Sequence, residues 1–268
     1  MNYRRTSIEK EIVEVSEVGH TNIKRELAVE APVALVYNGL SYAVMMVTPH
    51  DLENFAIGFS ITEGIVSFRG DILDIDIVNV EAGIIARIEI KKSCFKNVQK
   101  KPRNLVGQSS CGLCGVEDLE AALPTLTPLE TPFRLSSGII RIALKAMPIH
   151  QVENQKTGAM HAAAFVDSDG VISELQEDVG RHSALDKLVG KLAKSGKDIS
   201  TGFLLLTSRC SFELVQKAIQ AKLPLLVSVS APTDLAVELA IENNLGLIAL
   251  ARDDTMLLLN DPWDSFGE

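Results

Sequence analysis

The C-terminal third of the chain alternates short aliphatic runs with amphipathic segments of helix length. The aliphatic runs fall at residues 203–206, 225–229 and 247–250, with amphipathic segments between them at 211–221 and 234–243. Short buried strands joined by helices predict a parallel sheet with helices packed on its faces. We therefore expect an α/β domain in this part of the chain.

The first hundred residues follow a different pattern. Two β-rich runs flank Asn38-Gly39 within residues 32–48, which predicts a hairpin with a tight turn. A helix is expected at 48–64, and residues 72–90 alternate apolar and polar side chains as an antiparallel strand pair does. The basic residues 91–103 are typical of an exposed connecting loop. This part should form a smaller N-terminal α+β region.

Three regions follow along the chain. Residues 1–103 form the N-terminal α+β region, 104–135 carry a cysteine motif, a short helix at 116–123 and a linker, and 136–268 form the α/β domain. Within the last region, Ser136-Ser137 precede a helix, residues 160–176 predict a hairpin, and a further helix follows Asp178.

Composition excludes several classes of protein. A net charge of -9 over 268 residues argues against nucleic-acid binding, because such proteins gather Lys and Arg on one face. The first residues lack the apolar run of a signal peptide, and no segment has the roughly 18 uninterrupted apolar residues of a membrane span. The four cysteines are too few for a disulfide scaffold. We expect a cytoplasmic protein with reduced thiols.

The motif SSCGLCG at residues 109–115 places Cys111 and Cys114 in a C-x-x-C pair. A structural zinc would need two more ligands, and neither Cys94, Cys210 nor the scattered histidines have paired spacing. A zinc deaminase would need H-x-E, but the second residue after His161 is alanine. A sulfur carrier fits better, since flanking glycines expose the thiols and nearby basic residues stabilise a thiolate. We predict no metal ligands, although a zinc site stays an alternative.

Polar side chains follow the predicted strands of the α/β domain. Ligands bind at the carboxyl ends of such strands, where Arg209, Ser230 and Arg252 supply groups suited to an oxyanion. Ser211 and Thr233 are equally expected as ordinary helix N-caps.

A second charged stretch covers residues 177–187 and includes Arg181 and His182. It predicts either a polar site or a solvated helix face, with Asp178 as the helix cap in the second case. His161, in an apolar strand, is expected to be a satisfied core residue.

Five segments together carry a family resemblance: CGLCG, TGAMHAAA, EDVGRHSALDKLVG, TSRCSFELVQKA and SVSAPTDLAVELA, in this order. In these motifs the chain resembles the formate dehydrogenase accessory sulfurtransferase family, FdhD, from about Ala31 onward. The resemblance implies a cytidine-deaminase-like α/β fold, with a mixed sheet flanked by helices and without deaminase chemistry. It also implies a homodimer.

The same resemblance implies a function. Members take persulfide sulfur from a cysteine desulfurase and pass it to the molybdenum bis-guanine-dinucleotide cofactor, which formate dehydrogenase needs for activity. By the resemblance, Cys111 would carry the persulfide with Cys114 as its partner. From their place at the strand ends, we expect Arg209 and Ser230 to hold cofactor phosphates together with Arg252. The cofactor contacts expected from the resemblance are Arg252, Asp253, Asp254, Thr255, Met256 and Leu257. A cofactor-binding chaperone without sulfur chemistry and a zinc-stabilised interaction protein are the alternatives.

Overall fold

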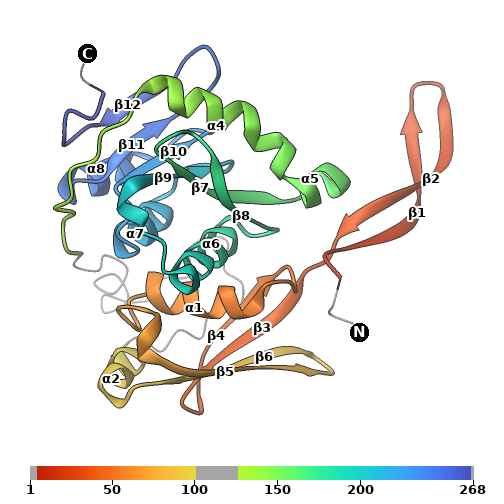
Figure 1. Ribbon diagram of the computed structural model, residues 1–268. Helices are drawn as coiled ribbons and strands as arrows, with labels where there is room; N and C mark the ends of the chain where they lie inside the picture. Colours follow the sequence, from red (N-terminus) through yellow and green to blue (C-terminus); the bar gives the residue numbers. More distant parts are fainter. Residues whose placement is uncertain (1–4, 101–125, 267–268) are drawn as a thin grey trace.

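The computed structural model describes residues 5–100 and 126–266 of the chain (Figure 1). Its largest part is a six-stranded sheet with the order β12-β11-β10-β9-β7-β8. The central strands β9, β10 and β11 are parallel, whereas β12, β7 and β8 run antiparallel to their neighbours. The predicted parallel series is therefore confirmed inside a mixed sheet. These strands are β7 (His161–Asp167), β8 (Ile172–Asp178), β9 (Gly202–Leu206), β10 (Leu225–Ser228), β11 (Gly246–Ala249) and β12 (Leu257–Asn260).

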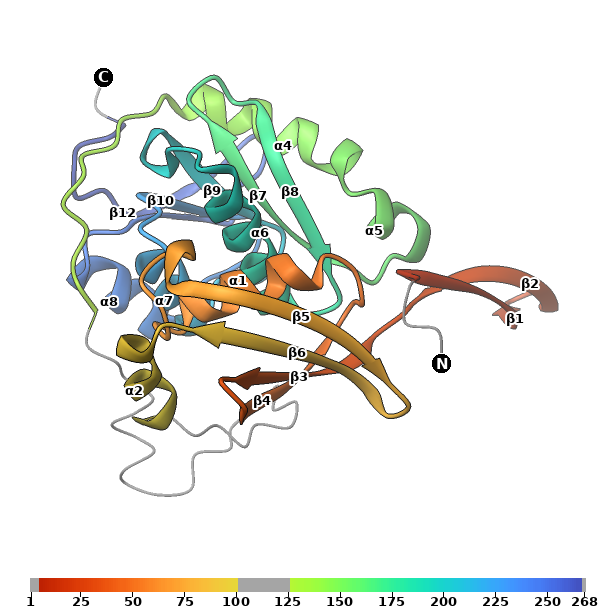
Figure 2. The same ribbon diagram turned by 60° about the horizontal axis from the view of Figure 1, so that its bottom comes forward.

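Helices cover both faces of this sheet (Figures 1 and 2). One face packs against a core to which α6, α7 and α8 contribute, and the other face packs against α4. Ser136 accepts a hydrogen bond from the Gly138 N–H and begins α4, as its sequence predicts. The helices of this part are α4 (Ser137–His150), α5 (Val152–Thr157), α6 (Arg181–Ser195), α7 (Phe212–Gln220) and α8 (Asp234–Glu242), with a 3-10 turn at Ile199–Thr201.

The N-terminal region forms a separate four-stranded sheet with the order β4-β3-β6-β5. Its predicted hairpin is confirmed, with positive φ at Asn38 (46°) and Gly39 (84°) in the turn. The antiparallel pair β5-β6 is likewise confirmed. The elements of this region are β3 (Ala31–Tyr37), β4 (Leu40–Val47), α1 (Leu52–Thr62), a 3-10 turn at Arg69–Asp71, β5 (Ile72–Val80), β6 (Gly83–Ile90) and α2 (Lys92–Lys100).

Helices α1 and α6 lie between the two sheets and join them (Figure 2). They cross closely because each presents a glycine to the backbone of the other. Gly58 lies against the carbonyl of Asp186, and Gly190 lies against the carbonyl of Asn54, with no space for a Cβ at either position. The two sheets therefore share one continuous apolar core.

Two parts of the N-terminal region differ from expectation. Residues 92–100 form the helix α2 instead of a loop, because Val98 is fully buried and Phe95 packs against the core. Residues 7–28 form a projecting hairpin of β1 (Ser7–Ser16) and β2 (Gly19–Ala28), which the sequence analysis missed (Figure 1). The helix expected at 116–123 lies outside the described residues. None of the helices in the described ranges is long and apolar enough to cross a membrane.

Candidate ligand site at the strand ends

A cavity of about 510 Å³ opens at the carboxyl ends of the parallel strands. Thr207, Val229 and Ala251 line it, and each of them comes one or two residues after the end of β9, β10 or β11. His161, the first residue of the neighbouring antiparallel strand β7, lines the same cavity. The opposite wall comes from α4, α5 and the residues that follow α5. The site therefore lies where an α/β sheet normally binds ligands.

Hydrogen bonds connect the loops that form this rim. The backbone of Cys210 pairs with Ala231 and Thr233 in the next loop. The Ser228 hydroxyl donates to the carbonyl of Ser208 (2.8 Å), and the Ala251 N–H donates to the carbonyl of Ser228 (3.0 Å). Because each loop is tied to its neighbour, the rim is preorganised.

The predicted cofactor-binding residues lie at this rim, but only Asp253 among them lines the cavity. Ser230 is half-buried, and Arg209 and Arg252 are exposed just after their strands. The Arg252 N–H donates to the carbonyl of Thr255 (2.8 Å), which closes a turn between β11 and β12. Of the remaining three, Asp254 is exposed, Met256 packs partly against the core, and Leu257 begins β12.

His161 is a site residue that the sequence analysis passed over. It is half-buried and lines the cavity, rather than being a satisfied core residue. Burial lowers the pKa of His161, and the positive charges of Arg181, His182 and Arg209 lower it further. Its imidazole is therefore neutral at pH 7. Residues from two separate segments, Arg181-His182 and Arg209, thus act on one histidine.

The start of α6 faces the start of α7 beside this histidine. His182 Nε2 lies 2.8 Å from Glu213 Oε2, and this close contact lowers the pKa of Glu213. The Nε atom of Arg181 and the hydroxyl of Ser211 are buried without a hydrogen-bond partner among the described residues. Ser211 and Thr233 do occupy N-cap positions, but neither side chain makes a capping hydrogen bond.

Asp178 has a different role from the predicted helix cap. Gly180 occupies the N-cap position of α6, and Asp178 is fully buried in an ion pair with Lys187 at 2.6 Å. The Asp178 carboxylate also accepts the Thr48 N–H (3.0 Å), and Lys187 Nζ donates to the Thr48 carbonyl (2.9 Å). This part of the charged stretch therefore holds the N-terminal region against the α/β domain.

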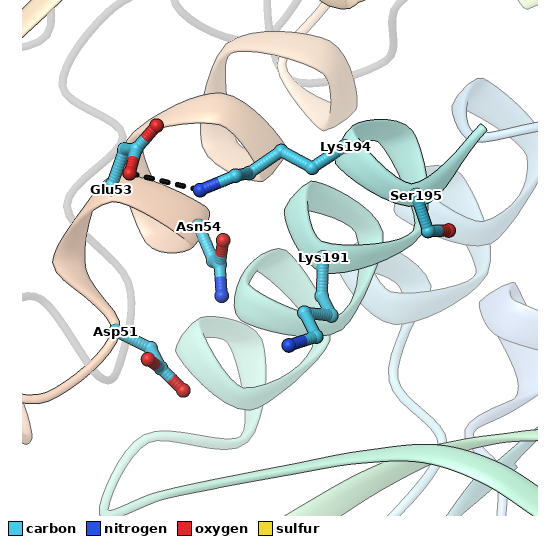
Figure 3. Close-up of a pocket in the computed structure, with 6 residues that line it drawn as sticks. All are labelled: Asp51, Glu53, Asn54, Lys191, Lys194 and Ser195. Atoms are coloured by element: carbon cyan, nitrogen blue, oxygen red, sulfur yellow. Dashed lines mark hydrogen bonds and ion pairs between the residues drawn. The ribbon is translucent and has the colours of Figure 1, made fainter.

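A second pocket lies between α1 and α6, away from the strand ends (Figure 3). It measures about 370 Å³ and is lined by both acidic and basic side chains. Lys194 Nζ and Glu53 Oε2 form an exposed ion pair at 2.9 Å. Figure 3 shows no interaction between Lys191 and the other residues drawn. Its charges largely compensate one another, so this pocket is a weaker candidate for a charged ligand.

The two motif cysteines, Cys111 and Cys114, lie outside the described residues. Of the other two, Cys210 is fully buried, and this burial raises its pKa to about 12. Cys94 is half-buried on α2. Within residues 5–100 and 126–266, no three His, Cys, Asp or Glu side chains come together as metal ligands do.

Comparison with known proteins identifies the family. The FdhD/NarQ family matches residues 28–263. Sulfur carrier protein FdhD of Cupriavidus necator is 47% identical over 227 residues, which cover 85% of this chain and 79% of that protein. The protein of the same name from Xanthomonas euvesicatoria is 44% identical over 236 residues, covering 88% of this chain and 84% of the relative.

A solved structure confirms the fold. A crystal structure from Desulfotalea psychrophila, described as that of a candidate formate dehydrogenase accessory protein, superposes with a TM-score of 0.75. The match covers 96% of this chain and 98% of that one at 23% sequence identity. Together with the sequence matches, it confirms the resemblance drawn from the five motifs: this chain belongs to the FdhD/NarQ family.

Proposed function

We propose that this protein is a sulfur carrier that acts in the maturation of formate dehydrogenase. The observation that carries the proposal is the match over residues 28–263, with relatives named sulfur carrier protein at 41–47% identity. A C-x-x-C pair with flanking glycines is suited to this work, because the thiolate is the attacking species in persulfide exchange.

The proposed donor is the persulfide of a cysteine desulfurase. The Cys111 thiolate attacks the outer sulfur of that persulfide, a new S–S bond forms on Cys111, and the desulfurase cysteine leaves as a thiolate. For delivery, the Cys114 thiolate attacks the Cys111 sulfur and expels the outer sulfur as sulfide. The resulting Cys111–Cys114 disulfide is reopened by a dithiol reductant of the thioredoxin class.

The proposed acceptor is the molybdenum bis-guanine-dinucleotide cofactor, bound as a substrate at the strand ends. A cavity of about 510 Å³ is in the size range of ligand sites and takes one part of this large molecule. Exposed Arg209 and Arg252 at the rim suit its phosphates. The homodimer expected from the family resemblance stays a prediction.

Loading of Cys111 can be measured by mass spectrometry of the intact protein. After incubation with a cysteine desulfurase and cysteine, the wild-type chain should gain one sulfur atom that a thiol reductant removes. Cys111→Ala should gain none and should not activate formate dehydrogenase, whereas Cys94→Ala, a matched control, should load normally. Full activation by Cys111→Ala would refute sulfur carriage and favour a cofactor chaperone.

The acceptor can be tested separately by calorimetry with a guanine nucleotide. Arg252→Gln should weaken binding about tenfold if its guanidinium contacts a phosphate, since such charged hydrogen bonds contribute about 1.5–3 kcal/mol. Lys191→Gln removes a charge from the other pocket and should leave binding unchanged (Figure 3). Equal affinities of the wild type and Arg252→Gln would remove this residue from the site.

A further inference from the structure

Basic side chains gather beside His161, which lines the strand-end cavity together with Thr207. Arg209 follows Thr207 by two residues, and Arg181 follows by three residues Asp178, which pairs with His161 across β7 and β8. Arg181 and His182 are the first two residues of α6, and Arg209 lies in the loop after β9. All three lower the pKa of His161 electrostatically. Of these, His182 is already paired with Glu213. Arg181 also lowers the pKa of Glu213 electrostatically. Neither Arg181 nor Arg209 forms an ion pair with any residue that the structure describes.

Several polar groups at this end also lack partners. The Arg181 Nε–H and the Ser211 hydroxyl are buried with no hydrogen-bond partner in the described part of the chain. Leaving such groups unsatisfied costs about 1–3 kcal/mol each, and most buried polar groups in native proteins are paired. These donors lie where α6 and α7 begin, so the free N–H groups of two helices add to the positive potential.

The arrangement contrasts with the charge of the whole protein. At a net charge of -9, the chain repels anions in general. Arginines without an ion-pair partner beside a cavity therefore point to an anionic ligand at that place. The acidic group nearest to this cavity is Asp253, whose carbonyl accepts a hydrogen bond from Arg141 of α4. Asp253 therefore belongs to the α4 side of the cavity, away from β7.

We propose that Arg181, Arg209 and His161 form a phosphate-binding subsite at the β7 end of the cavity, distinct from the turn at residues 252–257. The two guanidinium groups donate to phosphate oxygens, and the neutral imidazole donates its single N–H. Guanidinium groups suit phosphate because their planar donors match two oxygens at once. The subsite deepens the proposed function, since it would hold one phosphate of the cofactor while the turn holds another.

Pyrophosphate binding by calorimetry tests the subsite directly. Arg209→Gln should weaken pyrophosphate binding at least tenfold, and because Arg209 is exposed this change does not endanger folding. Arg181→Gln should do the same. Lys191→Gln, which removes an equal charge further along α6, is the matched control and should change affinity less than twofold. Equal weakening by Lys191→Gln, or none by Arg209→Gln, would overturn the proposal.

An NMR titration of the histidines gives a second readout. A bound anion offsets the positive charge of Arg181 and Arg209 beside His161, so pyrophosphate should raise the pKa of His161 towards its ordinary value. The signal is assigned with His161→Gln, and His20 on the projecting hairpin serves as the internal reference. A His161 titration that is unchanged by saturating pyrophosphate would contradict the subsite.

Three ligands show which part of a nucleotide the subsite recognises. Arg209→Gln should bind pyrophosphate and GDP more weakly than the wild type does, whereas its affinity for guanosine should be unchanged. An equal loss of affinity for guanosine and GDP would contradict phosphate recognition.

A separate measurement distinguishes the subsite from the proposed function. Persulfide loading of Cys111 should stay normal in Arg209→Gln. Loss of pyrophosphate binding with normal loading supports the subsite, and failure of loading in the wild type would refute sulfur carriage alone.

Discussion

At the scale of single residues, burial separates the cysteines by reactivity. Cys210 lies in one of the five motifs that carry the family resemblance, yet its thiol is fully buried and its pKa is raised to about 12. At pH 8 the thiolate fraction of such a group is about one part in ten thousand, and only the thiolate attacks. Cys210 therefore contributes to packing at the rim and not to sulfur transfer.

This assignment predicts the pattern of alkylation. With iodoacetamide at pH 8 and a short reaction time, Cys210 should stay unmodified in the folded protein and react readily in urea. Peptide mass mapping measures both. Cys94 is half-buried and should react faster than Cys210 in the native state. Labelling of both at the same rate would show that the loop after β9 opens freely.

At the scale of elements, the crossing of α1 and α6 decides how the two sheets meet. The crossing depends on Gly58 and Gly190, since a methyl group at either position would overlap a backbone carbonyl of the other helix. Backbone atoms cannot rotate away as the end of a long side chain can. The helices would have to move apart, which exposes apolar surface along the whole contact.

Gly58→Ala should consequently destabilise the protein by at least about 3 kcal/mol, as severe overpacking does. The free energy of unfolding in urea measures the effect. Gly138→Ala is the control: it is also a helical glycine, but a Cβ there would meet only the Ser136 Oγ, at an ordinary contact distance of 3.6 Å. Its substitution should stabilise by up to about 1 kcal/mol through helix propensity. Similar losses for the two variants would show that the helix contact is not decisive.

At the scale of the whole molecule, a buried ionic cluster joins three helices. Lys217 of α7 lies 2.9 Å from Asp186 of α6 and 3.1 Å from Glu63 at the end of α1. Burial alone would lower the pKa of Lys217, but Asp186 and Glu63 raise it above its ordinary value. A raised lysine pKa means that the charged form is favoured at every pH below it, so Lys217 carries its positive charge at pH 7. Burial raises the pKa of Asp186 in the same cluster, and the charge of Lys217 opposes that rise.

Lys217→Met should destabilise the protein by about 3–5 kcal/mol, because it leaves buried carboxylates without their cation. Lys194→Met, which removes the exposed partner of Glu53, should cost less than about 1 kcal/mol. Urea denaturation at pH 7 measures both changes. A loss below about 1 kcal/mol for Lys217→Met would mean that water or another group compensates the carboxylates.

The shared core also predicts cooperative unfolding. Trp263 is the single tryptophan and lies in the α/β domain, so its fluorescence reports on that part, whereas far-UV circular dichroism reports on all elements. The two signals should give the same midpoint in urea. Separate midpoints would contradict cooperative unfolding. The division of the chain into residues 1–103, 104–135 and 136–268 stays a prediction.

The sequence by itself determined the elements whose patterns are local. Alternating aliphatic runs and amphipathic segments predicted β9, α7, β10, α8 and β11, and Asn38-Gly39 predicted its hairpin turn. The family also followed from the sequence, because it depends on the order of five motifs. The α2 helix was missed because residues 92–100 are mostly polar or charged and have few apolar positions. Those apolar side chains stabilise the helix only by packing against the core, which the sequence does not show.

Only the tertiary structure decided which polar groups share a site. His161 and Thr207 line the same cavity because β7 pairs antiparallel with β9, so that Ala162 hydrogen-bonds to Thr207. No local pattern encodes this order of strands. Similarly, the sequence left open whether residues 177–187 form a polar site or a solvated helix face. Asp178 and Asp186 are in fact buried, where Lys187 and Lys217 reach them in three dimensions. Local preferences act over a few residues, whereas burial and electrostatic contacts depend on how distant segments pack together.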